Sequence, residues 1–146
     1  SEEVNPIEAK TLLEEIIHEA RRNSIEISLR IHDSVELLIA RNAFKRALTN
    51  LIDNAANNGK QLEIVLQLNG SVVELIFDDD GPGIPVDMRE EVFKPFFRLD
   101  QSRNVETGGT GLGLSIARDI IRTHGGDIIL SESSLGGLRA KVTVPI

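Results

Sequence analysis

The chain has no cysteine, tryptophan or tyrosine, and it has only one methionine and three histidines. Without cysteine, disulfides, thiol catalysis and cysteine-based zinc sites are excluded. The three histidines are too scattered to predict a transition-metal site. No apolar run approaches the length that a membrane-spanning helix needs. No signal peptide is visible, and because the chain begins at Ser1 rather than Met we expect it to be a piece of a longer protein.

Charge and aromatic content exclude further classes. The 16 basic and 23 acidic residues give a net charge of −7, which argues against a protein that wraps duplex nucleic acid. Aromatic residues are 3% of the chain, all five of them Phe, which is too few for a platform that stacks single-stranded bases. The length of 146 residues predicts one domain, and 40% hydrophobic residues are enough for an ordinary core.

Periodicity predicts an alternation of helices and strands. We expect a helix over 6–22 with Pro6 in its first turn, and strands over 25–31 and 35–40. A second helix is predicted from residue 41 to Asn58-Gly59, followed by a hairpin of strands 62–68 and 72–77 around Asn69-Gly70. Residues 83–109 are expected to be irregular, with a helical stretch near 85–93; helix 112–124 and strands 128–130 and 140–144 close the chain. This order favours an α+β two-layer sandwich.

Two asparagines on the second predicted helix form the first candidate site. Asn50 and Asn54 are four residues apart, so they share one helix face at the border of the apolar stripe. Asn is a poor helix-interior residue, so two of them one turn apart require a reason. A neutral amide oxygen is a hard ligand that suits Mg²⁺ beside phosphates. The alternative is a solvated polar face.

An acidic, glycine-rich segment after the predicted strand 72–77 is the second candidate. In Asp79-Asp80-Gly81-Pro82-Gly83-Ile84 the glycines allow close approach of a ligand to the backbone. A carboxylate at a strand end can accept a hydrogen bond from an exocyclic amine such as that of adenine. An acidic turn is the alternative; a calcium-binding EF-hand loop fails, because Pro82 occupies a ligand position and Arg89 replaces the closing Glu.

The third candidate is the glycine-rich run at 108–114, Gly-Gly-Thr-Gly-Leu-Gly-Leu, which leads directly into a predicted helix. Uncovered backbone N–H groups and the positive end of the helix dipole together form an anion-binding cradle. A P-loop is excluded, because the Gly59-Lys60 pair is followed by Gln61, and the spacing does not fit a dinucleotide fingerprint. A flexible glycine-rich turn is the alternative.

The fourth candidate is Phe93-Lys94-Pro95-Phe96-Phe97-Arg98, followed by a polar stretch. A polar loop hinged by glycines and anchored by aromatics is typical of a lid. Arg98 would be a fixed cation for a phosphate. The alternative is that the Phe side chains only fill the core.

These four segments occur in the order of the N, G1, F and G2 boxes of the ATP-binding domain of sensor histidine kinases, and the resemblance covers essentially the whole chain. It extends to the terminal Val142-Thr143-Val144-Pro145. It implies a Bergerat fold, in which a mixed, mostly antiparallel sheet packs against three helices with an ATP lid. The short lid, about a dozen residues, is similar to that of the osmosensor class.

The resemblance implies ATP and Mg²⁺ as cofactors and assigns roles to matching residues. Asn54 would coordinate Mg²⁺, Asn50 would support it from one turn earlier, and Arg98 would contact the terminal phosphates. Asp79 would accept the adenine amino group. The other nucleotide-binding residues that it implies are Gly81, Gly83, Ile84, Phe97, Gly109, Thr110, Gly111, Leu112, Gly113 and Leu114.

The implied reaction is transfer of the γ-phosphoryl group to a histidine on a dimerisation domain of the parent kinase, and from there to a response regulator receiver domain. Residues 1–146 would be the catalytic domain alone, so the acceptor histidine would lie upstream. We expect the isolated domain to be monomeric, the parent to be a homodimer and the domain to be cytoplasmic. Attachment of the parent to the inner membrane is a family expectation, and no nucleic-acid partner is expected.

One departure from the family keeps an alternative open. Where the family usually has a Lys or Arg and then an aromatic residue or His, this chain has Asn57 and Asn58. The alternative is therefore a degenerate nucleotide-binding or docking module without kinase activity. A serine kinase of the anti-sigma type or a gyrase-like ATPase on the same fold is a third hypothesis, against which the phenylalanine-rich segment argues.

Overall fold

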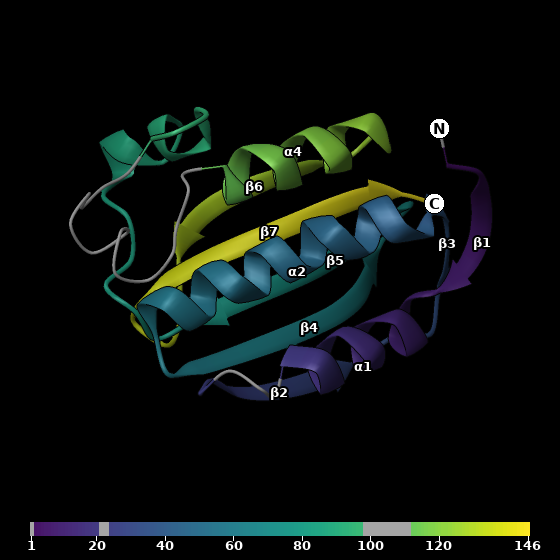
Figure 1. The fold of residues 1–146 in the computed structure, drawn as a ribbon. Helices are drawn as coiled ribbons and strands as arrows, with labels where there is room; N and C mark the ends of the chain where they lie inside the picture. Colours follow the sequence, from purple (N-terminus) through teal and green to yellow (C-terminus); the bar gives the residue numbers. More distant parts are fainter. Residues whose placement is uncertain (1, 21–23, 98–111) are drawn as a thin grey trace.

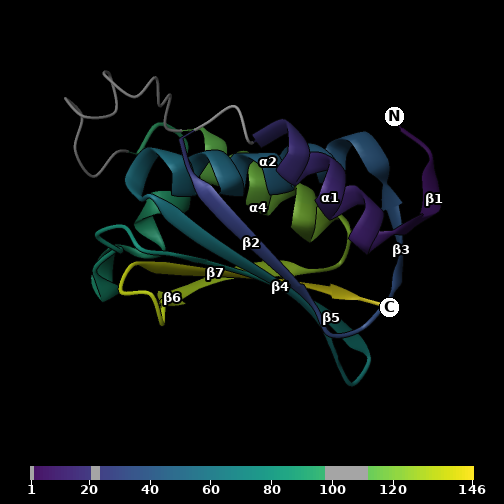
Figure 2. The same ribbon diagram turned by 90° about the horizontal axis from the view of Figure 1, so that it is seen from below.

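The computed structural model describes residues 2–20, 24–97 and 112–146. Its elements are β1 (Val4–Glu8), α1 (Ala9–Ala20), β2 (Glu26–Ile31), β3 (Glu36–Ala40), α2 (Arg41–Asn58), β4 (Gln61–Asn69), β5 (Val72–Asp79), η1 (Val86–Met88), η2 (Glu91–Phe93), α4 (Gly113–Thr123), β6 (Asp127–Glu132) and β7 (Leu138–Pro145). Helices α1, α2 and α4 cover one face of the sheet β2-β4-β5-β7-β6 (Figures 1 and 2). Only β2 and β4 pair in parallel in that sheet. The predicted two-layer α+β sandwich with a mixed, mostly antiparallel sheet is confirmed.

The alternation of side chains along β5 explains where the core ends and the polar residues begin. Val73, Leu75 and Phe77 are buried beneath the helices. Because side chains alternate between the two faces of a strand, Asp79 continues this inward-facing row at the last position of β5. The sequence of β5 therefore directs a carboxylate toward the helices at the end of the strand.

Helix α2 lies across the middle of the sheet and is fixed at its N-terminal end by two side chains from distant segments. Its N-cap residue, Ala40, offers no side-chain cap. The carboxylate of Glu2 accepts hydrogen bonds from the N–H groups of Asn42 (2.7 Å) and Ala43 (3.0 Å), which satisfies free donors where the helix dipole is positive. The Nε2 atom of His124 accepts from the N–H of Ala40 at 3.1 Å.

The prediction of one helix over 6–22 is wrong at its beginning. Residues Val4–Glu8 form β1, which pairs with β3 in a separate two-stranded antiparallel sheet, and α1 begins at Ala9. Pro6 lies opposite Leu38 in this ribbon, where an edge strand can tolerate the missing N–H group. Ile7 is apolar and packs against the core directly before the helix, so it was included in the apolar stripe of α1 although it belongs to a strand.

The remaining predicted elements are confirmed within a few residues. Helix α2 ends at Asn58, β4 and β5 form the predicted hairpin around Asn69-Gly70, and α4, β6 and β7 follow in the expected order. Two short 3₁₀ helices occupy the predicted helical stretch near 85–93. Among the helices in the described ranges, none combines the length and the apolar character that crossing a membrane requires.

Candidate functional site

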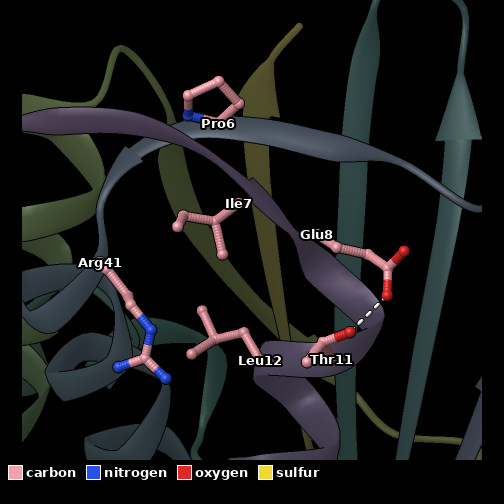
Figure 3. A pocket seen from close by; sticks show the side chains of 6 residues that line it. All are labelled: Pro6, Ile7, Glu8, Thr11, Leu12 and Arg41. Atoms are coloured by element: carbon pink, nitrogen blue, oxygen red, sulfur yellow. Dashed lines mark hydrogen bonds between the residues drawn. The ribbon is translucent and has the colours of Figure 1, made fainter.

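Parts of three predicted site segments meet a turn that was not predicted as part of the site, at one end of the sandwich. The C-terminal end of α2, the end of β5, the turn between β6 and β7 and the beginning of α4 lie together there (Figure 1). The opposite end of α2 borders a different feature, a cavity of about 260 Å³ (Figure 3). That cavity is lined by Pro6, Ile7, Glu8, Thr11, Leu12 and Arg41. Arg41 and Asn54 are separated by about 20 Å of helix, so this cavity is separate from the predicted site.

Asp79 is buried, with 4% of its surface exposed, and one of its two carboxylate oxygens is fully engaged. Oδ1 accepts hydrogen bonds from the backbone N–H groups of Gly81 (2.9 Å) and Leu138 (3.0 Å). Among the described residues, none donates a hydrogen bond to Oδ2. Every fully buried side-chain oxygen of these residues has a hydrogen-bond partner, so Oδ2 is not fully buried and keeps some access to solvent. Burial raises the pKa of Asp79, which the two backbone hydrogen bonds oppose. The residue offers one acceptor atom, held in a fixed direction.

Close backbone contacts around Asp79 explain three of its neighbouring glycines. A Cβ atom on Gly81 would lie 2.6 Å from the carbonyl oxygen of Asn58, and Gly83 has a φ of +72°. A Cβ atom on Gly137 would lie 2.2 Å from Asp79 Oδ1. The sequence analysis did not single out Gly137, although its N–H donates to the carbonyl oxygen of Asp79 at 3.1 Å.

Asp80 is a second residue whose role the sequence analysis did not predict. Its Oδ1 atom accepts hydrogen bonds from the N–H groups of Gln61 (2.9 Å) and Lys60 (2.8 Å), and these bonds hold the pKa of Asp80 below its usual value. These two residues lead out of α2 into β4. Asp80 therefore ties the end of β5 to the end of α2, which fixes Asp79 relative to the helix that carries Asn54.

The two predicted asparagines are in different situations. Asn50 donates from Nδ2 to the carbonyl oxygen of Gly113 at 3.2 Å, so it joins α2 to the first residue of α4. Asn54 is half-buried, and its side-chain amide makes no hydrogen bond to another described residue. Its backbone carbonyl accepts from Nδ2 of Asn58 at 2.7 Å. Asn54 is thus the member of the pair whose side chain is available to a ligand.

The beginning of α4 and the segment before residue 98 complete the described part of the site. Leu112, Gly113 and Leu114 are half-buried at the N-terminal end of α4, where the helix dipole is positive. Ile84 and Phe97 are partly buried against the core. Arg98, Gly109, Thr110 and Gly111, together with the predicted lid, lie outside the described residues.

The residues present fit a magnesium ion held mainly by phosphate oxygens. In the described ranges, no three His, Asp or Glu side chains gather into a protein-only cage. Mg²⁺ commonly binds through one or two protein oxygens together with phosphates and water. The free amide oxygen of Asn54 supplies one such neutral, hard donor, and the neighbouring beginning of α4 favours anions.

Comparison with known proteins agrees with this geometry. Residues 39–146 match the family described as histidine kinase-, DNA gyrase B-, and HSP90-like ATPase. The sensor histidine kinase CpxA of Escherichia coli K12 is 39% identical over 106 residues, which cover 72% of this chain and 23% of CpxA. This chain therefore spans about a quarter of the length of that relative.

Solved structures extend the likeness to the whole fold. The mycobacterial sensor histidine kinase MprB has a TM-score of 0.84 at 26% identity, with 97% of each chain covered. The histidine kinase domain of the E. coli osmosensor EnvZ has a TM-score of 0.75 at 30% identity, covering 100% of this chain and 91% of that one. The chain thus belongs to the family of histidine kinase-, DNA gyrase B- and HSP90-like ATPases. Within that family it is the ATP-binding domain of a two-component sensor histidine kinase.

Proposed function

We propose that this domain binds Mg-ATP and donates the γ-phosphoryl group to a histidine on the dimerisation domain of its parent kinase, for relay to a response regulator receiver domain. The observation that carries the proposal is the combination, at one end of the fold, of Asp79 and Asn54: within the described ranges, one carboxylate oxygen of Asp79 and the side-chain amide of Asn54 make no hydrogen bond. The first suits the amino group of adenine, and the second suits a metal beside phosphates.

In the proposed binding mode, Oδ2 of Asp79 accepts a hydrogen bond from the adenine amino group. Gly81 and Gly83 shape the base pocket, and Ile84 and Phe97 are further proposed nucleotide-binding residues. Asn54 would hold Mg²⁺, which would supply positive charge beside the phosphates. Asn50 supports this arrangement by holding the beginning of α4 against α2. The remaining proposed phosphate-binding groups are Arg98 and the backbone of Gly109, Thr110, Gly111, Leu112, Gly113 and Leu114.

The proposal extends to the parent protein. The acceptor histidine would lie on a dimerisation domain outside this chain, so the isolated domain would be monomeric and the parent a homodimer. The domain would work in the cytoplasm, with attachment of the parent to the inner membrane. In this arrangement the isolated chain binds nucleotide, but it phosphorylates histidine only when the dimerisation domain is supplied.

Asn54→Ala tests the metal role, and Asn57→Ala is the matched control because Asn57 is an exposed residue in the last turn of the same helix. Affinity for a non-hydrolysable ATP analogue is measured by calorimetry with and without Mg²⁺. We expect Asn54→Ala to remove most of the gain in affinity that Mg²⁺ gives the wild type, while Asn57→Ala keeps that gain. Equal dependence on Mg²⁺ in both variants would contradict the assignment of Asn54.

Transfer is tested by adding the histidine-bearing dimerisation domain of the parent and labelled ATP. We expect acid-labile label on the added domain, and none when Asn54→Ala replaces the wild type. Wild-type protein that binds no nucleotide at millimolar concentration would instead favour a docking module without kinase activity. Binding without transfer, accompanied by hydrolysis, would favour a gyrase-like ATPase.

A further inference from the structure

Arg118 is a buried cation that the nucleotide-binding residues do not account for. It lies on α4 with 9% of its surface exposed. Its Nη1 and Nη2 atoms donate to the two carboxylate oxygens of Glu90 at 3.0 and 3.2 Å, and its Nε donates to Oδ1 of Asp127 at 3.1 Å. The guanidinium carbon lies 3.9 Å from the centre of the Phe93 ring. Both the edge and the face of the guanidinium plane are therefore in use.

The partners of Arg118 come from separate parts of the chain. Glu90 and Phe93 belong to the segment that contains η1 and η2, which precedes residues 98–111, whereas Arg118 is on the helix that follows them. Asp127 begins β6. One side chain therefore joins the described elements on either side of residues 98–111 to each other and to the sheet.

The chemistry of these contacts requires arginine. A guanidinium group can form two parallel hydrogen bonds to one carboxylate while it stacks on an aromatic ring, and a lysine ammonium cannot do both. Burying a cation is costly unless all of its partners are in place, so such an arrangement specifies one geometry more than it adds stability. This contact set fixes the angle and distance between α4 and the segment that carries Phe93.

We propose that Arg118 is a positioning residue for the phosphate end of the nucleotide, because it holds the beginning of α4 and the Phe93 segment in a fixed relation. The inference rests on the proposed function, in which the beginning of α4 borders the phosphates and the Phe93 segment leads directly into Arg98, a proposed phosphate-binding residue. The adenine end is held by other contacts: Asp79 is fixed by Gly81, Gly137 and Leu138, whereas the hydrogen bonds of Arg118 within the described ranges go to Glu90 and Asp127. Loss of Arg118 should therefore weaken the binding of phosphates and spare the binding of the base.

Arg122→Met is the matched control for Arg118→Met. Arg122 is on the same helix and also donates to Asp127 Oδ1 at 3.1 Å, but its side chain is 53% exposed and its hydrogen bonds within the described ranges go to Asp127. Arg118→Lys keeps the charge without the planar fork. Glu90→Gln changes the other side of the contact at a side chain that is 77% exposed, so the fold should tolerate it.

The experiment compares dissociation constants for two ligands, a non-hydrolysable ATP analogue with Mg²⁺ and plain adenosine, in the wild type and the four variants. We expect Arg118→Met to weaken binding of the analogue roughly tenfold, as for the loss of a charge-assisted contact, and to leave adenosine unchanged. Arg118→Lys should recover part of the loss, Glu90→Gln should show a smaller loss of the same kind, and Arg122→Met should match the wild type.

Two results would overturn the positioning role. If Arg118→Met weakens the binding of both ligands by the same factor, Arg118 makes a general structural contribution. The same conclusion follows if Arg122→Met loses as much affinity for the analogue as Arg118→Met does. Should Arg118→Met not fold, unchanged affinity of Glu90→Gln for the analogue would overturn the role. A wild-type protein that binds neither ligand would overturn the proposed function itself, and the inference with it.

Discussion

Replacing Asp79 by asparagine changes one atom of the site and leaves its shape intact. The side-chain oxygen of Asn can still accept hydrogen bonds from the N–H groups of Gly81 and Leu138, as Oδ1 does in the wild type at 2.9 and 3.0 Å. The free acceptor Oδ2 becomes an NH₂ donor, which faces the adenine amino group in the proposed binding mode. In the variant, the amide NH₂ group and the adenine amino group are both donors, whereas in the wild type Oδ2 accepts a hydrogen bond from the amino group.

The size of the effect follows from the lost contact. A hydrogen bond to a charged group contributes about 1.5–3 kcal/mol, and an unpaired buried donor adds to the cost. We therefore expect Asp79→Asn to lose about 2–3 kcal/mol of binding free energy for an ATP analogue, or roughly 30- to 150-fold in affinity. An inosine nucleotide, which has a carbonyl oxygen in place of the amino group, should lose much less.

Calorimetric titration with both analogues, with thermal unfolding measured in parallel, tests the prediction. Asp78→Asn is the matched control, because Asp78 is the neighbouring buried carboxylate but faces the other side of the sheet and is bonded to Arg139 by two contacts of 2.9 Å. We expect Asp78→Asn to lower the melting temperature without changing nucleotide affinity. Equal losses for the adenine and inosine analogues in Asp79→Asn would refute the proposed contact.

The same variant has a defined dependence on pH. Burial raises the pKa of Asp79 in the folded protein, so the neutral carboxyl group is favoured by folding. The associated stability is present below the ordinary pKa of the carboxyl group and is lost as the pH rises through the raised pKa. Asp79→Asn does not undergo this loss. Its free energy of unfolding should therefore rise relative to that of the wild type as the pH increases from the ordinary pKa of the carboxyl group through the raised pKa. A constant difference between the two would contradict the burial argument.

Two further predictions concern backbone packing and surface charge. Gly137→Ala places a Cβ atom 2.2 Å from Asp79 Oδ1 and 2.5 Å from the Gly81 nitrogen. We therefore expect it to destabilise the fold by about 1–3 kcal/mol and to weaken nucleotide binding. Gly113→Ala is the control for stability: a Cβ atom there meets no atom within 4 Å, so the melting temperature should not change. Asn57→Lys adds a cation to the last turn of α2, which has no basic residue. It should raise stability by about 0.3–1 kcal/mol in thermal unfolding, an increase that high salt should reduce.

The elements that the sequence predicts well are those whose signals are local. Helix α2 has a continuous apolar stripe and ends beside Asn58-Gly59, and Asn69-Gly70 marks the β4–β5 hairpin. Strand β1 was missed because its structure depends on pairing with β3, 28 to 36 positions further along the chain. The segment Val4–Glu8 has only two branched apolar residues, Val4 and Ile7, which is too weak a local signal for a strand without its partner.

The same distinction applies to the site. The strand-end position of Asp79 could be read from the alternation of apolar residues before it. The N–H group of Leu138 and the close approach of Gly137 could not, because they reach Asp79 from 59 and 58 positions away. The contacts of Arg118 could not be predicted for a related reason. On an amphipathic helix an arginine normally lies on the solvated face, and only the folded chain places Glu90 and Phe93 against it.

One of the two asparagines that replace the usual family residues after Asn54 has a structural role. Asn58 donates from Nδ2 to the carbonyl oxygen of Asn54, and the N–H of Gly59 donates to the carbonyl oxygen of Ala55, so these two carbonyl groups near the end of α2 are bonded without a cation. The side chain of Asn58 is thereby turned back along the helix, beside the residue proposed to hold Mg²⁺. The departure therefore removes a charge from the phosphate end while it stabilises the helix end that presents Asn54, and so we expect it to act on affinity and to leave the geometry of the site unchanged.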